Sequence, residues 1–291
     1  MTDEAHESNI IIYTDGSKIN SYVGCAFVAY AQNQEIYSQV FRLGELSTIF
    51  QAEMFAILMA VTWTNDTYND CYITIISDSA SSLATLHNNE LHPISTKIKH
   101  VVCTSNNMYT FQWTMAHHGT VGNERADFLA KTAASNTCLP VSYNKISMNV
   151  VKRILWLELI NEWQGRWNEC EGSNTYRFLP SIEETYKFKW IKPNHWITQF
   201  LTNHGKFASY FARFSGLNTN LCPICQIEDG NVHYIFHCPI LERERNEIQN
   251  ILHQQGISWP CDLPNLINTK ENFFYFNNLT KRYGKLTTIR A

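Results

Sequence analysis

Short apolar runs rich in β-branched residues alternate with polar segments along the first half of the chain. Such runs predict buried strands, which we place at 10–14, 24–31, 35–43, 72–76 and 109–115. Apolar side chains that recur every three or four positions predict helices at 48–63, from 79 onwards, at 95–103 and at 121–134. The first three strands follow one another as a meander, and the later strands alternate with helices. This order predicts an α/β fold with five strands.

A stretch that contains serine, asparagine, threonine and proline at 135–146 interrupts this pattern and predicts a linker. Beyond it, spaced apolar residues predict one amphipathic helix at 147–167: Val150, Val151, Ile154, Leu157 and Ile160. We expect three rings on this helix to pack in a core rather than to stack on bases: Trp156, Trp163 and Trp167. Residues 172–220 are rich in aromatics but show no clear period. The chain therefore divides into a domain at 1–137 and a mainly helical region at 138–291.

Four carboxylates stand in short motifs of the first domain. Asp15 and Asp78 each follow the end of a predicted strand, whereas Glu53 and Asp127 lie on predicted helices. Each acid alone is most simply explained as a turn, a helix cap or a solvated helix face. Two adjacent parallel strands, however, would place Asp15 and Asp78 side by side at one edge of the sheet. Like charges gather in one cleft only with cations, and ligands that are all oxygen favour Mg²⁺ or Mn²⁺.

The segments around these acids resemble the ribonuclease H domain of non-LTR retrotransposons. The matching segments are 13–17, 51–60, 76–86 and 113–130. The last is the most specific, because it contains Trp113, His117, Gly119, Gly122-Asn123-Glu124, Ala126 and Asp127. The resemblance covers residues 9–135 and implies a ribonuclease H-like fold, with a mixed five-stranded sheet flanked by helices. It also implies a hydrolase that works with two metal ions.

The resemblance assigns a role to each acid. Asp15 would bridge both ions, Glu53 and Asp78 would hold one of them, and Asp127 would help to hold the other. His117, in the loop before the last helix, would assist proton transfer or product departure, since imidazole titrates near neutral pH. His118 occupies a position where the family usually has a small residue, so we treat it as incidental. The implied reaction is hydrolysis of the RNA strand of an RNA–DNA hybrid, which leaves a 3′-hydroxyl and a 5′-phosphate.

Two other functions fit part of the pattern. One is a nucleic-acid-binding fragment without catalysis. The other is an integrase or transposase, which shares acids at strand ends, but the Glu53 helix and the Gly-Asn-Glu-x-x-Asp helix argue against it. Residues 1–140 hold 6 Lys and Arg against 13 Asp and Glu, whereas residues 141–291 hold 17 against 13. Because the first half has one basic cluster, at Lys97, Lys99 and His100, the second half is a plausible source of extra affinity for nucleic acid.

A second chemical motif lies in the C-terminal half. Cys222, Cys225, His233 and Cys238 have the spacing of a four-ligand structural zinc site. His237 is a rival for the imidazole position, and four residues without a metal are the alternative. With 163–167 and 198–205, this CCHC motif resembles the tail behind the ribonuclease H domain of arthropod R1-type elements. In that family the segment is the C-terminal part of a polyprotein, so the chain resembles a fragment whose partner would be a reverse transcriptase.

Residues 1–8 are polar and acidic, so a signal peptide is not expected. No apolar run approaches the length that spans a membrane. Nine cysteines are scattered along the chain. In an intracellular protein such cysteines are mostly small hydrophobic residues that are buried. We therefore expect a protein that is not secreted, has no membrane partner and acts in the nucleus or cytoplasm.

Overall fold

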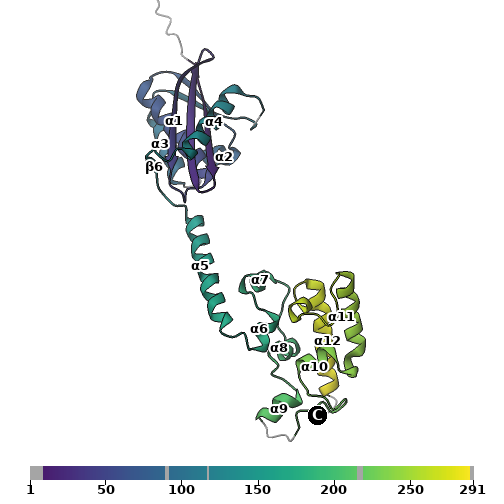
Figure 1. The fold of residues 1–291 in the computed structure, drawn as a ribbon. Coiled ribbons are helices and arrows are strands. Elements are labelled where there is room, and N and C mark those ends of the chain that lie inside the picture. The colour runs from purple at the N-terminus through teal and green to yellow at the C-terminus, as the bar shows by residue number, and fades with distance from the viewer. Residues whose placement is uncertain (1–8, 89–91, 117, 215–218, 289–291) are drawn as a thin grey trace, which may run out of the picture. The chain divides into compact units, whose positions relative to one another are not determined.

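The computed structural model describes residues 9–88, 92–116, 118–214 and 219–288 (Figure 1). The chain forms two compact units, unit 1 at 1–153 and unit 2 at 154–291. The sequence places this boundary at 137 and 138. The units divide later because the segment after the last helix of the domain stays bound to it. The Gln51 side-chain amide, for example, donates a 3.0 Å hydrogen bond to the carbonyl of Lys145.

Unit 1 is built on a mixed sheet of six strands in the order β5-β4-β1-β2-β3-β6. The strands are β1 (Asn9–Ile19), β2 (Tyr22–Ala31), β3 (Gln34–Leu43), β4 (Tyr72–Ser77), β5 (Met108–Trp113) and β6 (Val141–Tyr143). The meander β1-β2-β3 is antiparallel, whereas β4 pairs in parallel with both β1 and β5. All five predicted strands are present. The prediction of five was one short, because β6 has three residues and pairs in parallel with β3 inside the stretch expected to be a linker.

Helices cover both faces of this sheet. They are α1 (Ile49–Thr67), α2 (Ala80–His87), α3 (Pro93–Thr104) and α4 (Val121–Ser135). Helix α1 starts with a capping box between Thr48 and Gln51, and it shares one core with α3 and with inward side chains such as Ile12. Helix α4 packs on the ring of Tyr13 through Gly122, where a Cβ atom would lie 2.2 Å from the ring. Because neighbouring strand residues point to opposite faces, α4 covers the face opposite α1.

Unit 2 is helical, as predicted for the C-terminal region. Helix α5 (Met148–Asn168) leads into it, and the later elements are α6 (Asn174–Phe178), α7 (Ile182–Lys187), α8 (His195–Thr202), α9 (Ala208–Phe214), α10 (Asn231–Phe236), η1 (Pro239–Leu241), α11 (Glu242–Gln254), η2 (Leu263–Leu266) and α12 (Lys270–Thr288). Their core is rich in aromatics, including Phe178, Phe200, Phe207, Phe276 and Tyr283. Within the described ranges, none of the helices has the length and apolarity needed to cross a membrane.

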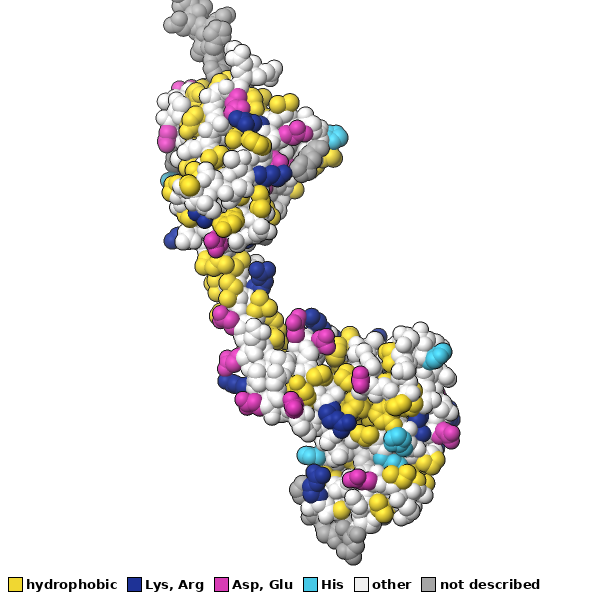
Figure 2. Space-filling view, in the orientation of Figure 1, with side chains coloured by type: hydrophobic (Ala, Val, Ile, Leu, Met, Phe, Trp, Pro, Cys, Tyr) yellow, Lys and Arg dark blue, Asp and Glu magenta, His cyan; other side chains and the backbone are white. Residues whose placement is uncertain are grey.

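Two of the tryptophans on α5 are not core residues, which corrects the prediction. The side chains of Trp156 and Trp163 are 37% and 49% exposed, and hydrophobic side chains colour the surface of α5 in Figure 2. Trp156 instead lies against the ring of Tyr186, at 4.7 Å between ring centroids. Trp167 is half-buried and donates from Nε1 to the carbonyl of Leu179 at 2.7 Å. Apolar residues occur all round α5, so its sequence could not show which face is covered.

Candidate active site and metal centre

Three of the four predicted acids converge at one edge of the sheet in unit 1. Asp15 lies on β1, Asp78 directly follows β4, and Glu53 lies on α1. The parallel register pairs Thr14 with Ser77, so Asp15 and Asp78 lie at the same level on neighbouring strands. Strand β1 continues to Ile19, however, so Asp15 lies inside its strand and not after its end, which corrects the prediction. One carboxylate oxygen from each of Asp15, Glu53 and Asp78 lies within 4.8 Å of the others. The prediction that parallel pairing brings Asp15 and Asp78 together is therefore confirmed, although only Asp78 stands at the end of its strand.

A glycine brings Glu53 close to the strands. A Cβ atom on Gly16 would lie 2.5 Å from the backbone nitrogen of Glu53 and 2.9 Å from Cβ of Ala52. The absence of a side chain at Gly16 thus lets α1 approach β1, and the carboxylate of Glu53 reaches the edge where Asp15 ends. Gly16 lies inside β1, opposite Cys25 on β2, so this close approach and not a turn requires a glycine here.

The three acids form a site of high negative potential. Burial, together with the charges of Asp78 and Asp127, raises the pKa of Asp15 to about 7. Burial and the charges of Asp15 and Asp78 also raise the pKa of Glu53 well above its usual range. Oε2 of Glu53 is buried and has no hydrogen-bond partner among the described residues. Buried, mutually repelling carboxylate oxygens of this kind fit a divalent cation, which would supply the missing countercharge.

Asp127 lies on α4 close enough to raise the pKa of Asp15 and Glu53, but it is outside the group of three. Its Oδ2 atom forms an ion pair with Nζ of Lys131, at 2.7 Å, one turn further along the helix. Sequence analysis gave Lys131 no role, although its position four residues after Asp127 predicts this pairing. The predicted catalytic residue His117 lies outside the described residues.

Two further side chains hold Asp78. The amide of Asn123 donates a 3.3 Å hydrogen bond to Oδ2 of Asp78, and Nε1 of Trp113 donates to its carbonyl at 3.0 Å. Asn123 is 3% exposed, and its Oδ1 atom has no partner within the described parts of the chain. Both residues belong to the matching segment 113–130. Their link to Asp78 could not be deduced without the register of β4 and β5, which places Trp113, and the packing of α4, which places Asn123.

A basic groove of about 1460 Å³ lies in the same unit. Much of its lining is apolar, but it includes four cations, Lys18, Lys97, Lys145 and Arg153. Among the described residues that line it there is no Asp or Glu. Thr48, the N-cap of α1, and Gln51 in its first turn also line it. The predicted basic cluster of Lys97, Lys99 and His100 lies on α3. Lys97 contributes to the groove, whereas Lys99 turns to the carbonyl of Asn88 at 2.6 Å.

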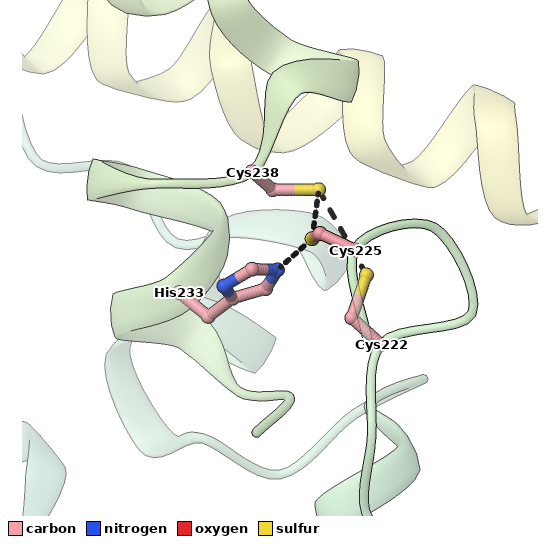
Figure 3. A group of neighbouring side chains, drawn as sticks. All are labelled: Cys222, Cys225, His233 and Cys238. Carbon is pink, nitrogen blue, oxygen red and sulfur yellow. Dashed lines mark hydrogen bonds between the residues drawn. The ribbon is translucent and has the colours of Figure 1, made fainter. Parts of the chain in front are cut away.

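The predicted cysteine and histidine ligands meet in unit 2 (Figure 3). Sγ of Cys222 is 3.9 Å from Sγ of Cys238, and Cys225 is 3.9 Å from Cys238 and 3.2 Å from Nε2 of His233. Zn–S bonds of about 2.3 Å at a tetrahedral centre separate two sulfurs by about 3.8 Å, so these distances fit one zinc ion. All four cysteine and histidine side chains are buried or half-buried, whereas the rival His237 is exposed.

A tight turn presents the first two cysteines. The amide of Gln226 donates to the carbonyl of Cys222 at 2.9 Å, and the amide of Cys222 donates to Ile227 at 2.8 Å. Burial alone would raise the pKa of Cys222, but hydrogen bonds from the backbone of Cys225 and Ile224 bring it below its ordinary value. Backbone amides directed at sulfur stabilise thiolates, the form that binds metal.

The motif at 198–205 supports the start of α10. Oδ1 of Asn203 accepts from the backbone of Asn231, and the amide of Asn231 donates to the carbonyl of Phe200 at 2.7 Å. Asn231 starts α10, which carries His233. The buried side chain of Gln199 accepts from the backbone of Lys206 at 3.0 Å and fixes the chain after α8. These bonds fix the start of the helix that presents the imidazole.

Comparison with known proteins identifies the first of these two parts. Residues 7–135 match the family model for RNase H. A Pol polyprotein of the type-1 retrotransposable element R1 4 from Nasonia vitripennis is 35% identical over 120 residues, which are 40% of this chain and 30% of that protein. The R1 Pol polyprotein of Bradysia coprophila is 29% identical over 103 residues, 35% of this chain and 10% of that protein. Residues 7–135 are therefore an RNase H domain, and the chain is homologous to R1 Pol polyproteins.

The chain spans about a third or less of the length of these relatives. Among solved structures, RNase H1 from Halobacterium salinarum is similar at 19% identity and a TM-score of 0.37, over 43% of this chain and 96% of that one.

Proposed function

We propose that unit 1 is an endoribonuclease that hydrolyses the RNA strand of RNA–DNA hybrids with divalent metal ions. The observation that carries this proposal is the convergence of Asp15, Glu53 and Asp78, two of them buried, with a carboxylate oxygen of Glu53 that lacks a partner in the described structure. That arrangement is unfavourable without cations, and it occurs in a domain of the RNase H family.

The residues would share two ions, Mg²⁺ or Mn²⁺. Asp15 would contact both, Glu53 and Asp78 would hold one, and Asp127 would help to hold the second after giving up its pairing with Lys131. When bound, such ions stabilise the attacking and leaving oxygens of a phosphodiester. Asn123 would keep the carboxylate of Asp78 oriented, and His117 would take or supply a proton near neutral pH.

The basic groove supports a nucleic-acid substrate. Unit 1 is acidic in total, yet the described residues that line this groove include four cations and no carboxylate, so it is where a polyanion would be attracted. Phosphates would position the duplex there, while the 2′-hydroxyls that only the RNA strand carries would mark the strand to be cut. Unit 2 would bind one structural Zn²⁺ through Cys222, Cys225, His233 and Cys238 and add affinity rather than chemistry.

A reverse transcriptase would be the natural supplier of the hybrid, because RNA–DNA hybrids arise during DNA synthesis on RNA. Such a reaction would place the protein inside the cell, in the nucleus or cytoplasm.

The direct test uses the full chain with three end-labelled duplexes of one sequence, RNA–DNA, DNA–DNA and RNA–RNA, and repeats the RNA–DNA reaction with EDTA. Cleavage of the RNA strand in the hybrid with Mg²⁺ or Mn²⁺, and products that end in 3′-hydroxyl and 5′-phosphate, is the expected result. Equal cleavage of the DNA duplex, or nicking and joining of DNA strands, would instead support an integrase-like activity.

A second candidate is a nucleic-acid-binding fragment without catalysis. The ion pair between Asp127 and Lys131 favours it, since it keeps the fourth acid apart from the other three. Binding of the hybrid without turnover, unchanged by Asp78→Asn, would select this candidate. Loss of turnover in Asp78→Asn with binding retained would select the nuclease.

A further inference from the structure

A buried arginine lies directly beside the cysteine and histidine cluster of unit 2. Arg245 on α11 is 6% exposed. Its Nε donates a hydrogen bond of 2.8 Å to the carbonyl of Ile235. Its Nη2 donates hydrogen bonds to the carbonyl of Tyr234, at 3.2 Å, and to the carbonyl of Cys238. Tyr234 and Ile235 directly follow His233 in the chain, and Cys238 is itself one of the four ligand residues. The guanidinium therefore joins the two segments that present the third and fourth ligands.

This cation has no carboxylate to neutralise it within the described parts of the chain. No acid lies within ion-pair distance of Arg245, and the acid whose charge it senses, Glu242, is exposed to solvent. Burial lowers the pKa of Arg245, whereas the nearby Cys238 thiol, when ionised, raises it. Charged side chains are almost never fully buried without a partner, because desolvation costs several kcal/mol per ion.

The cluster offers the charge that is missing. Three thiolates and one neutral imidazole around a divalent cation carry a net charge of −1. A buried anion of that kind is as costly alone as a buried guanidinium alone. Placed side by side in a poorly hydrated site, the two charges offset each other.

We infer that Arg245 is the buried countercharge of an anionic metal–trithiolate centre formed by Cys222, Cys225, His233 and Cys238. The inference rests on the proposed zinc site and deepens it, because it makes the charge of the bound cluster part of how unit 2 is stabilised. The simpler role for Arg245 is to satisfy the free carbonyls at the end of α10, a role that depends on hydrogen bonds and not on the charge of the cluster.

The test measures Zn²⁺ affinity of the full chain by competition with a chromophoric chelator, and the thiolate-to-metal absorption of the Co²⁺ form. Arg245→Gln removes the charge but keeps amide donors, whereas Arg245→Lys keeps the charge but loses the planar fork. We expect Arg245→Gln to weaken Zn²⁺ binding by about tenfold or more. Arg245→Lys should weaken Zn²⁺ binding by a clearly smaller factor. Arg243→Gln is the matched control, because Arg243 lies on the same helix with its side chain 85% exposed.

A change of cluster charge supplies the second arm. Cys225→His makes the bound centre neutral, so the effect of Arg245→Gln should largely disappear in that background. Equal losses in both backgrounds, or an Arg245→Lys variant as weak as Arg245→Gln, would overturn the inference and leave a hydrogen-bonding role. If Cys225→His binds no metal, the Zn²⁺ affinities of Arg245→Lys and Arg245→Gln are enough to decide. A wild-type chain without zinc affinity would overturn the proposed site itself, which is a distinguishable result.

Discussion

The side-chain amide of Asn123 donates a hydrogen bond of 3.3 Å to Oδ2 of Asp78, which ties the first turn of α4 to the end of β4. A carboxylate held in this way is oriented before a metal arrives. We expect Asn123→Ala to lower kcat on the hybrid about tenfold and to raise the Mg²⁺ concentration needed for half-maximal cleavage. Glu124→Gln, an exposed change in the same turn, is the control. Equal kinetics for Asn123→Ala and the control would show that Asp78 needs no such support.

The ion pair between Lys131 and Asp127 competes with a metal for the same carboxylate. Lys131→Gln should therefore lower the Mg²⁺ concentration that gives half-maximal cleavage, since it removes a cation that also acts on Asp15. Arg125→Gln serves as a control on the same helix, because Arg125 pairs at 3.1 Å with Glu35 instead. A higher Mg²⁺ requirement in Lys131→Gln would mean that Lys131 assists the site rather than competing with the metal.

The stability of the metal-free protein should depend on pH through Asp15. Its pKa is raised from 3.8 to about 7 in the folded protein, so between about pH 4 and 7 the folded state holds a proton that the unfolded chain releases. Stability contributed by this carboxyl is therefore lost as pH rises through that window. The Tm difference between Asp15→Asn and wild type in EDTA isolates this effect from the histidines. We expect that difference to grow from pH 5 to 7.5 in favour of Asp15→Asn, and a constant or shrinking difference would contradict the raised pKa.

The cluster in unit 2 should contain about one zinc ion per chain. The double change Cys222→Ser and Cys225→Ser should abolish that zinc and unfold the surroundings of α10, because metal binding and folding are coupled in such sites. Unit 1 should remain folded and cleave the hybrid, with weaker binding. Elemental analysis and limited proteolysis check this, with Cys103→Ser, an exposed cysteine, as control. An unchanged fold in a chain without zinc would rule out the metal site.

The strands and the three converging acids were predictable because the hydrophobic period is a local feature of the sequence, although β1 continues past Asp15 to Ile19. Ile10 and Ile12 mark a buried strand by themselves, and parallel pairing then brings Asp15 to Asp78. Strand β6 was missed because three residues leave no period to detect. The exposure of Trp156 and Trp163 could not be deduced either, since it depends on which neighbours α5 has.

The elements at 172–220 lacked a signal for a different reason. Helices α6, α7, α8 and α9 have five to eight residues, too short for an amphipathic period. Their ends are set by single side chains, such as Asn194, whose Oδ1 accepts from the amides of Trp196 and Ile197. The role of Arg245 could not be predicted either, because the sequence of an amphipathic helix does not show whether an arginine on it is buried or exposed.

Asp15→Asn gives the most direct test of the proposed nuclease. Asp15 is the acid assigned to both metal ions, so the loss of its charge should reduce hybrid cleavage by about 10²-fold or more at saturating Mg²⁺. Hybrid affinity should be retained or slightly increased, because a negative charge facing phosphates disappears. The measurement is single-turnover cleavage of a labelled hybrid by wild type and variant at matched occupancy, with folding checked by Tm. Cleavage of the hybrid by Asp15→Asn at a rate near that of the wild type would contradict the two-metal assignment.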